Sequence, residues 1–356
     1  AGTSGLGGGV EWLVLEGAAV NNLKNLKVSF PLGRFIAVTG VSGSGKSSLV
    51  RECLVPALKM KLGSRVPAGK NVGAVGKIVA GYERIRNVYE VDQSPIGRTP
   101  RSIPATYVGF FDDIRRLFAN LPEARLRGYG PGRFSFNHAD GRCPECIGAG
   151  MVKLEMSFMP TAYVPCGLCR GARFNPATLE IRFRGRNIAD VLDMTVGEAL
   201  EFFSTLPRIR RSLQALHETG LDYLRLGQPS STLSGGEAQR IKLVTHLLSG
   251  LDDPTQIHYE KRRFNLFVLE EPTIGLHSSD VRKLVGVLHR LVDAGHTVVV
   301  IEHNMDLVAD ADWVIDLGPE AGENGGRVVG EGTPEEIARN KSSHTGKFLR
   351  KILNVA

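Results

Sequence analysis

The sequence predicts an α/β fold in which parallel strands are joined by helices, interrupted by an inserted and partly helical subdomain. A short β-branched run at 35–39 leads through a glycine-rich turn into apolar residues at helical spacing from 47 to 58. The same strand pattern returns at 266–269 and 297–301, with a helical pattern at 280–294 between them. The two ends of the chain are therefore expected to build one core.

The middle of the chain has a different character, rich in Arg, Gly, Pro and Cys and without repeated βα units. We expect a linker or cloning remnant at 1–9, the first part of the core at 10–109 and an inserted subdomain at 110–232. A cysteine module should lie at about 137–180, the second part of the core with its leading helix at 233–338, and a C-terminal segment at 339–356.

Composition indicates a globular protein with no membrane span. The 356 residues are 42% hydrophobic, and none of the apolar runs reaches the 18 residues that a spanning helix needs. A net charge of +7 favours an anionic partner, although scattered lysines on a nucleotide-binding enzyme would give the same value. Five cysteines without a secretory signal indicate a reducing cytoplasm.

The turn after the first core strand fits the phosphate-loop pattern G-x-x-x-x-G-K-[ST] in its required strand-to-helix context. Its backbone amides would face the phosphates of ATP, Lys46 would neutralise the β and γ groups, and Ser47 would hold Mg²⁺. A plain Gly-Ser turn would leave Lys46 and Ser47 unexplained. The predicted nucleotide-binding residues of this loop are Gly40, Ser42, Gly43, Ser44, Gly45, Lys46, Ser47 and Ser48.

A second motif starts a helix with Ser234, Gly235, Gly236 and Glu237 and resembles the signature of ABC ATPases. A hydroxyl and amides at a helix start can bind the γ-phosphate of a nucleotide held by a second molecule. The alternative is an ordinary helix cap, which the phosphate loop in the same chain makes less attractive.

Two adjacent acids, Glu270 and Glu271, end the strand at 266–269; one suits Mg²⁺ and the next suits a water-polarising base. His303 follows the strand at 297–301 and resembles the switch histidine of ABC ATPases, while Gln93 resembles their Mg²⁺-linking glutamine. A solvated loop residue is the alternative for both. The fold class is therefore an ABC-type P-loop ATPase core with an inserted helical signature subdomain.

Cys143-x-x-Cys146 and Cys166-x-x-Cys169 are separated by nineteen residues, a spacing typical of a structural four-cysteine zinc site. Glycines at 148, 150 and 171 suit the positive φ of such knuckles. A redox pair or an iron centre is the alternative, and Cys53 is expected to be a small core residue.

Basic and aromatic residues surround the module and could contact DNA phosphates and perturbed bases, although a solvated charged face would look the same. The aromatic candidates are Tyr129, Phe134, Phe136, Phe158 and Tyr163. The basic candidates are Arg98, Arg101, Arg115, Arg116, Arg125, Arg127, Arg133, Arg142, Lys153, Arg170 and Arg173.

The order of these motifs resembles the C-terminal half of the A subunit of the bacterial UvrABC excinuclease, or a close paralogue. The resemblance covers about 10–338 and rests on the phosphate loop, the strings DQSPIGRTPR, GRFSFN, YVPC, LGQP, LSGGEAQR and VIEH, and the module between them. It implies an ATP-, Mg²⁺- and Zn²⁺-dependent ATPase of nucleotide excision repair that senses distorted duplex DNA without being the nuclease. It also implies composite ATP sites shared with a second ATPase half or a homodimer, and a helicase-like B subunit as partner.

Two departures from the family pattern bear on activity. Glu270 stands where the family has aspartate, which alters Mg²⁺ geometry and leaves open a nucleotide-switched DNA clamp with weak hydrolysis. Variants of the family also act in resistance to DNA-binding drugs, so a drug-resistance paralogue is a further alternative. The segment 248–263 differs from the family strings and is expected to be a variable loop. A transporter cassette would lack the cysteine module, and a chromosome-maintenance ATPase would show heptads, which the insert lacks.

Overall fold

The computed structural model describes residues 9–63, 72–97, 99–156, 159–250 and 263–354. They divide into two compact units, the first made of Ala1–Asp92 with Asp253–Ala356 and the second of Gln93–Asp252. The two ends of the chain therefore build one core, as the sequence predicts. The expected linker, apart from Gly9, and most of the expected variable loop lie outside the described residues; Leu248–Gly250 belong to a helix.

The first unit is built on a six-stranded sheet of order β11-β10-β3-β9-β8-β5, whose only antiparallel pair among the described strands is β10 with β11. A three-stranded antiparallel sheet of order β2-β1-β4 accompanies it. The strands of the large sheet are β3 Phe35–Gly40, β5 Ile85–Val91, β8 Phe264–Glu270, β9 Thr297–Ile301, β10 Trp313–Gly318 and β11 Arg327–Gly332. The small sheet contains β1 Trp12–Ala18, β2 Leu26–Pro31 and β4 Lys77–Ala80.

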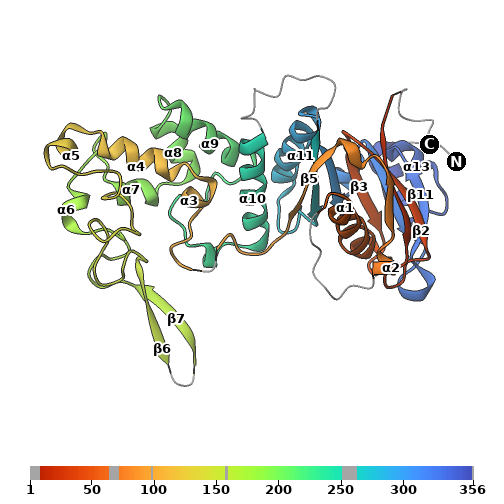
Figure 1. Ribbon diagram of the computed structural model, residues 1–356, viewed down its shortest axis with the longest axis horizontal. Coiled ribbons are helices and arrows are strands. Elements are labelled where there is room, and N and C mark those ends of the chain that lie inside the picture. Colours follow the sequence, from red (N-terminus) through yellow and green to blue (C-terminus); the bar gives the residue numbers. More distant parts are fainter. Residues whose placement is uncertain (1–8, 64–71, 98, 157–158, 251–262, 355–356) are drawn as a thin grey trace. The chain divides into compact units, whose positions relative to one another are not determined.

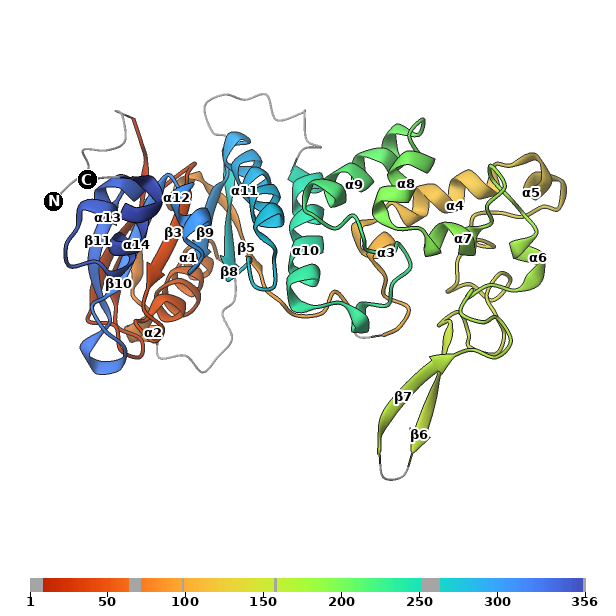
Figure 2. The same cartoon turned by 180° about the vertical axis from the view of Figure 1, so that it is seen from behind.

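Helices cover both faces of the large sheet because its strands alternate apolar side chains between the faces. Ile36 and Val38 pack with Leu54 and Leu58 on one face, whereas the Phe35 ring meets His289 of α11 at 5.7 Å on the other. The segment after the phosphate loop begins as a π-helical turn, η1 Ser48–Leu54, and continues as α1 Val55–Lys61. The other helices of this unit are α2 Val72–Val75, η2 Tyr82–Arg84, α11 Ser278–Asp293, α12 Met305–Ala309, η4 Gly322–Asn324, α13 Pro334–Arg339 and α14 His344–Leu353 (Figures 1 and 2).

Cys53 is fully buried in this core, which confirms the interpretation of it as a core residue. The expected boundary at 338 falls inside α13, and α14 belongs to the same unit. Its start is fixed there because Ser343 and Thr345 donate hydrogen bonds to the buried carboxylate of Asp316 on β10, at 2.6 and 2.7 Å.

The second unit is mainly helical, with one hairpin formed by β6 Met151–Met156 and β7 Met159–Pro165. Apolar side chains at helical spacing form its core, for example Ile209, Leu213 and Leu216 on one face of α9. Figure 1 shows the hairpin projecting from the rest of this unit. The helices are α3 Pro104–Val108, α4 Phe111–Ala119, α5 Pro122–Leu126, α6 Pro176–Leu179, α7 Ile188–Asp193, α8 Val196–Phe202, α9 Pro207–Glu218, η3 Ser230–Thr232 and α10 Gly235–Gly250.

The second unit is larger than the inserted subdomain expected at 110–232. It starts at Gln93, and it includes the signature helix α10, which we had assigned to the core at 233–338. The physical reason is packing, because Ala238, Ile241 and Val244 of α10 are buried in the apolar core of this unit.

Candidate nucleotide site and cysteine module

The phosphate loop connects β3 to η1, and its glycines are required by close backbone contacts. A Cβ at Gly40 would lie 2.0 Å from the carbonyl oxygen of Leu317, and φ is +132° there. Gly43 and Gly45 also have positive φ. The carbonyl of Gly43 accepts from the amide of Gly322 at 3.1 Å and that of Ser44 from Gly326 at 3.0 Å, so other segments of the unit hold the loop in shape.

Lys46 lies folded over this loop and is 6% exposed. Its Nζ donates to the carbonyl oxygens of Gly40 and Val41 at 3.0 and 2.9 Å. Burial lowers the pKa of Lys46, and nearby carboxylates, that of Glu271 first, oppose this effect. A phosphate would supply the buried ammonium with a full counter-charge in place of two carbonyl dipoles.

Ser47 and Glu270, the two residues predicted to hold magnesium, lie in contact. Ser47 Oγ donates to Glu270 Oε1 at 2.5 Å, and Arg51 Nη1 lies 2.6 Å from Glu270 Oε2. Oxygen donors of this kind suit Mg²⁺. The contribution of Arg51 was not anticipated, although its place one helical turn after Ser47 on the same helix is a usable signal.

Glu271 and His303 also lie side by side, with His303 Nε2 3.7 Å from Glu271 Oε1. Glu271 has a positive φ of 44°, and its amide donates to the carbonyl of Ile301 at 2.8 Å, which ties the end of β8 to the end of β9. A positive φ at a non-glycine residue stores backbone strain, a feature that clusters at functional sites.

Sequence reasoning gave no role to Glu302, which is 2% exposed and accepts four hydrogen bonds. One oxygen accepts from the backbone amide of Thr273 at 2.9 Å and from its hydroxyl. The other oxygen accepts from the amides of His303 and Asn304, at 2.6 and 2.9 Å. Glu302 thereby joins the loop after Glu271 to the loop that carries His303; its position next to a candidate histidine was the available signal.

The signature residues lie at the start of α10 in the second unit. Glu237 accepts from the amide of Ser234 at 2.7 Å, and Ser234 Oγ accepts from the amide of Glu237 at 3.3 Å, a reciprocal capping box. The second oxygen of Glu237 accepts from the Tyr223 hydroxyl at 2.7 Å. Within this unit, Glu237 therefore shapes the helix start that presents Gly235 and Gly236.

Gln93 lies against this helix start, since a Cβ added to Gly235 would be 3.0 Å from the Cβ and Oε1 of Gln93. Lys242, two helical turns further along α10, donates to Ser94 Oγ at 2.7 Å. The predicted glutamine and the predicted signature are thus brought together in one unit.

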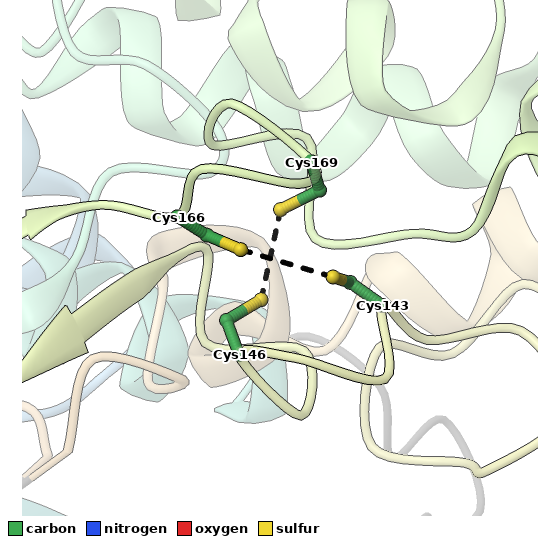
Figure 3. A group of neighbouring side chains, drawn as sticks. All are labelled: Cys143, Cys146, Cys166 and Cys169. Carbon is green, nitrogen blue, oxygen red and sulfur yellow. Dashed lines mark hydrogen bonds between the residues drawn. The ribbon is translucent and has the colours of Figure 1, made fainter.

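The side chains of the four paired cysteines point toward one another (Figure 3). In the sequence, one pair precedes the hairpin and the other follows it. Their Sγ atoms all lie within 4.8 Å of one another, with 3.9 Å between Cys143 and Cys166 and 3.6 Å between Cys146 and Cys169. These distances exclude disulfides, whose S–S bond is about 2.05 Å. Four thiolates around a tetrahedral ion with bonds of about 2.3 Å would be separated by about 3.8 Å, so the donor set fits zinc in both chemistry and geometry.

The knuckle glycines have the expected backbone conformation. Gly148, Gly150 and Gly171 have φ values of 80°, 75° and 92°. The amide of Gly150 donates to Cys146 Sγ at 3.2 Å, a contact typical of thiolate ligands.

Part of the predicted DNA-facing set is wrong. Phe134 and Phe136 are at most 1% exposed and pack against Phe118 and Phe111 in the core. Arg173 is 5% exposed. Aromatic rings in this unit are needed to fill its core, which explains the burial.

Other members of the set are engaged or only partly exposed. Arg115, Arg116 and Arg127 pair with carboxylates of their own unit. Tyr129 and Arg133 stack at 4.4 Å. Arg101 and Arg142 are half-buried, Arg125 is exposed and donates to Asn120, and Arg98 and the Phe158 side chain lie outside the described residues.

Lys153, Tyr163 and Arg170 remain on the surface of the module. Lys153 of β6 and Tyr163 of β7 are register partners and therefore lie on the same face of the hairpin. Tyr163 is 50% exposed, and Lys153 and Arg170 are also exposed. Of the residues predicted to face DNA, Lys153 and Tyr163 therefore form an exposed pair of a cation and an aromatic ring.

No helix in the described part of the chain is long and apolar enough to cross a membrane.

Comparisons with known proteins place this arrangement in a family. A family model described as Novel STAND NTPase 1 matches residues 17–105, the segment that holds the phosphate loop. The UvrABC system protein A of Thermus thermophilus is 57% identical over 349 residues, covering 98% of this chain and 35% of that protein. That of Methanothermobacter thermautotrophicus is 55% identical over 343 residues, covering 96% of this chain and 34% of that protein.

The crystal structure of UvrA2 from Deinococcus radiodurans matches with a TM-score of 0.84 and 50% identity, over 96% of this chain and 40% of that one. The chain spans about a third of the length of the curated relatives that it matches. At 57% and 55% identity over 98% and 96% of its length, and with a phosphate loop, a four-cysteine module and a signature helix in that order, the chain belongs to the family of UvrABC system protein A.

Proposed function

We propose that this chain is an ATP-binding and ATP-hydrolysing module of a protein that recognises damaged duplex DNA in nucleotide excision repair. The observation that carries the proposal is the coexistence of an ATPase site and a four-cysteine module in a chain 57% identical to a UvrABC system protein A. The full activity belongs to a longer protein, because this chain corresponds to about a third of its relatives.

The phosphate-loop residues bind the nucleotide. Amides of the loop from Gly40 to Ser48 face the phosphates, and Lys46 exchanges its two carbonyl contacts for phosphate oxygens. Ser47 and Glu270 would hold Mg²⁺, which would supply positive charge to the transferred phosphoryl group. Arg51 donates a hydrogen bond to the second oxygen of Glu270. This contact orients the glutamate side chain, which is longer than the aspartate of the family pattern.

Glu271 orients and polarises the attacking water, and His303 beside it contacts the γ-phosphate. By the family resemblance, Gln93, which lies against the start of α10, is the glutamine of the ABC-type ATPase. Ser234, Gly235 and Gly236, at the start of α10, serve a nucleotide held by the opposite ATPase half, so the partner is a second half or a second copy. Glu237 fixes the shape of that start.

The four cysteines would hold zinc, which would cross-link the two knuckles at the base of the hairpin. Lys153, Tyr163 and Arg170 then meet the DNA backbone and unstacked bases. Damage can be recognised without reading the base sequence, because a lesion lowers the energy that is needed to bend the duplex. By family membership, a helicase-like B subunit is the next partner.

The test is DNA binding and ATP hydrolysis by the full-length protein with lesion-bearing and intact duplexes of one sequence. We expect tighter, steeply salt-dependent binding to the damaged duplex, weakened at least fivefold by Lys153→Ala with Tyr163→Ala. Arg186→Ala, an exposed arginine outside the module, is the matched control. Equal and negligible binding to both duplexes would remove DNA as the ligand.

A further inference from the structure

Arg173 is a buried cation whose position connects the cysteine module to the segments that lead to Gln93 and Ser234. It follows Cys169 by four residues, is 5% exposed and has a positive φ of 69°. Burial lowers the pKa of its guanidinium to about 10. A buried arginine is costly unless its donors are satisfied, so its contacts show what holds it.

The guanidinium donates to backbone carbonyls of three separate segments. Nη1 donates to Pro100 at 3.1 Å and, at the limit of hydrogen bonding, to Gly148 at 3.5 Å; Nη2 donates to Gly227 at 3.1 Å. Gly148 belongs to the first knuckle. The guanidinium carbon also lies 5.3 Å from the centre of the Phe136 ring, which fixes the plane of the fork.

Pro100 and Gly227 belong to two segments that are hydrogen-bonded to each other. Ser230 donates from its amide to Ser102 at 2.8 Å and from its hydroxyl to Gly97 at 3.0 Å, and the amide of Ala105 donates to Leu226 at 3.2 Å. We call residues 97 and 99–105 with 226–230 the paired segments. One begins shortly after Gln93 and the other ends shortly before Ser234, and Gln93 lies against Gly235, the residue after Ser234, at the start of α10.

Beside Arg173, the module and the paired segments do not pack closely. A pocket of about 310 Å³ at this place is lined by Met151, Pro165 and Arg170 together with Gln228 and Pro229, and Arg173 forms part of its wall. Dense packing transmits displacement, whereas a cavity does not. At this place the hydrogen bonds of the Arg173 guanidinium therefore connect the module to the paired segments.

The module also supplies the charge that balances Arg173. Burial lowers the pKa of its guanidinium, and the sulfurs of Cys146 and Cys169 oppose this effect. A divalent ion with four thiolate ligands carries two net negative charges, and one buried guanidinium offsets half of them. The charge of the module therefore favours the buried guanidinium, whose position is set by the carbonyls of Pro100, Gly148 and Gly227.

We propose that Arg173 is the positioning residue that couples the four-cysteine module to the nucleotide-site elements of its unit. The three-way fork holds the first knuckle, the Pro100 segment and the Gly227 segment in one arrangement. A displacement of the module by a bound ligand is passed through these carbonyls to Gln93 and Ser234. That the ligand is DNA rests on the proposed function; the connection itself does not.

The test is hydrogen–deuterium exchange on the full chain with Arg173→Met, Arg173→Lys and the control Arg182→Met. Arg182 is also an arginine that donates to a backbone carbonyl, but to Gly185 in its own loop. We expect exchange in the paired segments to become at least tenfold faster in Arg173→Met and less so in Arg173→Lys. Zinc content, the exchange of α4 and α9, and the Arg182→Met profile should stay as in the wild type.

Unchanged exchange in the paired segments would overturn the proposal, as would an equal increase throughout the unit, which would show a merely structural role. If the methionine variant fails to fold, the lysine variant decides by the same criterion. In the full-length protein, Arg173→Met should lose the change in ATPase rate caused by DNA while keeping the basal rate. If the wild-type rate does not respond to DNA, the proposed function fails, and exchange still decides on Arg173.

Discussion

Glu302→Gln should impair ATP hydrolysis without removing any group that contacts nucleotide. The substitution keeps the size of the side chain but replaces one acceptor oxygen with an NH₂ group. That group would then face two donors, either the amide and hydroxyl of Thr273 or the amides of His303 and Asn304. Two of the four hydrogen bonds are lost, and the new NH₂ group faces two other hydrogen-bond donors in a buried environment.

The size of the effect follows from these contacts. Hydrogen bonds to a charged group contribute about 1.5–3 kcal/mol each, so losing two costs about 3–6 kcal/mol if the loops cannot rearrange. A domain of this size shifts by about 2–4 °C per kcal/mol, so the first unit should melt at least ~6 °C lower. Because Glu302 fixes His303 relative to the loop after Glu271, misplacement of the pair should lower kcat by tenfold or more with a small change in KM for ATP.

The assay is steady-state ATP hydrolysis together with thermal unfolding, with Glu335→Gln as the control because Glu335 is an exposed carboxylate of the same unit. The control should match the wild type in both measurements. An unchanged kcat in Glu302→Gln would refute the positioning argument even if the protein were less stable. A rise in KM alone would mean that Glu302 acts on nucleotide binding.

Three further predictions concern the remaining groups. Glu271→Gln should lower the rate of ATP hydrolysis 100-fold or more. The affinity for ATP, measured by fluorescence titration, should stay within about threefold of the wild-type value, because the phosphate loop is untouched. Cys143→Ser should reduce bound zinc measured by atomic emission to less than half and increase proteolysis of the β6–β7 hairpin, because a structural site with three thiolates binds far more weakly. His246 has a pKa lowered below 6.5 by burial. Below pH 6.5 the unfolded chain therefore binds a proton that the folded chain resists, and stability falls; the loss of melting temperature between pH 7.5 and pH 5.5 should be smaller in His246→Leu.

Each of these has an outcome that contradicts it. Residual hydrolysis in Glu271→Gln at a tenth of the wild-type rate would point to another base. Full zinc content in Cys143→Ser would show that the cysteines are not the ligands. An identical pH dependence of melting in wild type and His246→Leu would assign the acid sensitivity to other groups.

Several features were predictable from the sequence because local physics dictates them. Gly40, with φ of +132° against the Leu317 carbonyl, admits no side chain, and loops of this kind have a recognisable residue order. The Cys-x-x-Cys spacing brings the sulfurs together because each knuckle is a local structure closed by glycines of positive φ. Strand β9 at Thr297–Ile301 was predicted to the residue, since five apolar, β-branched-rich residues are typical of a buried parallel strand.

Other features depended on packing between distant parts of the chain. Phe134, Phe136 and Arg173 are aromatic and basic residues of the kind expected on a DNA-binding surface, and yet they are buried. The helix α10 belongs to the second unit because its apolar face is covered there. Sequence shows which residues are aromatic or basic, but burial depends on neighbours contributed by segments far along the chain.

The sequence by itself determined the kind of chemistry, the order of motifs and the family, because these reside in short strings whose backbone geometry admits few residues. Only the tertiary structure decided the partners of these residues. Examples are Arg51 on Glu270, the two donors of Thr273 on Glu302 and the three carbonyls on Arg173. The reason is that a hydrogen bond between residues tens to hundreds of positions apart leaves no local pattern, since it exists only when the folded core fixes both ends.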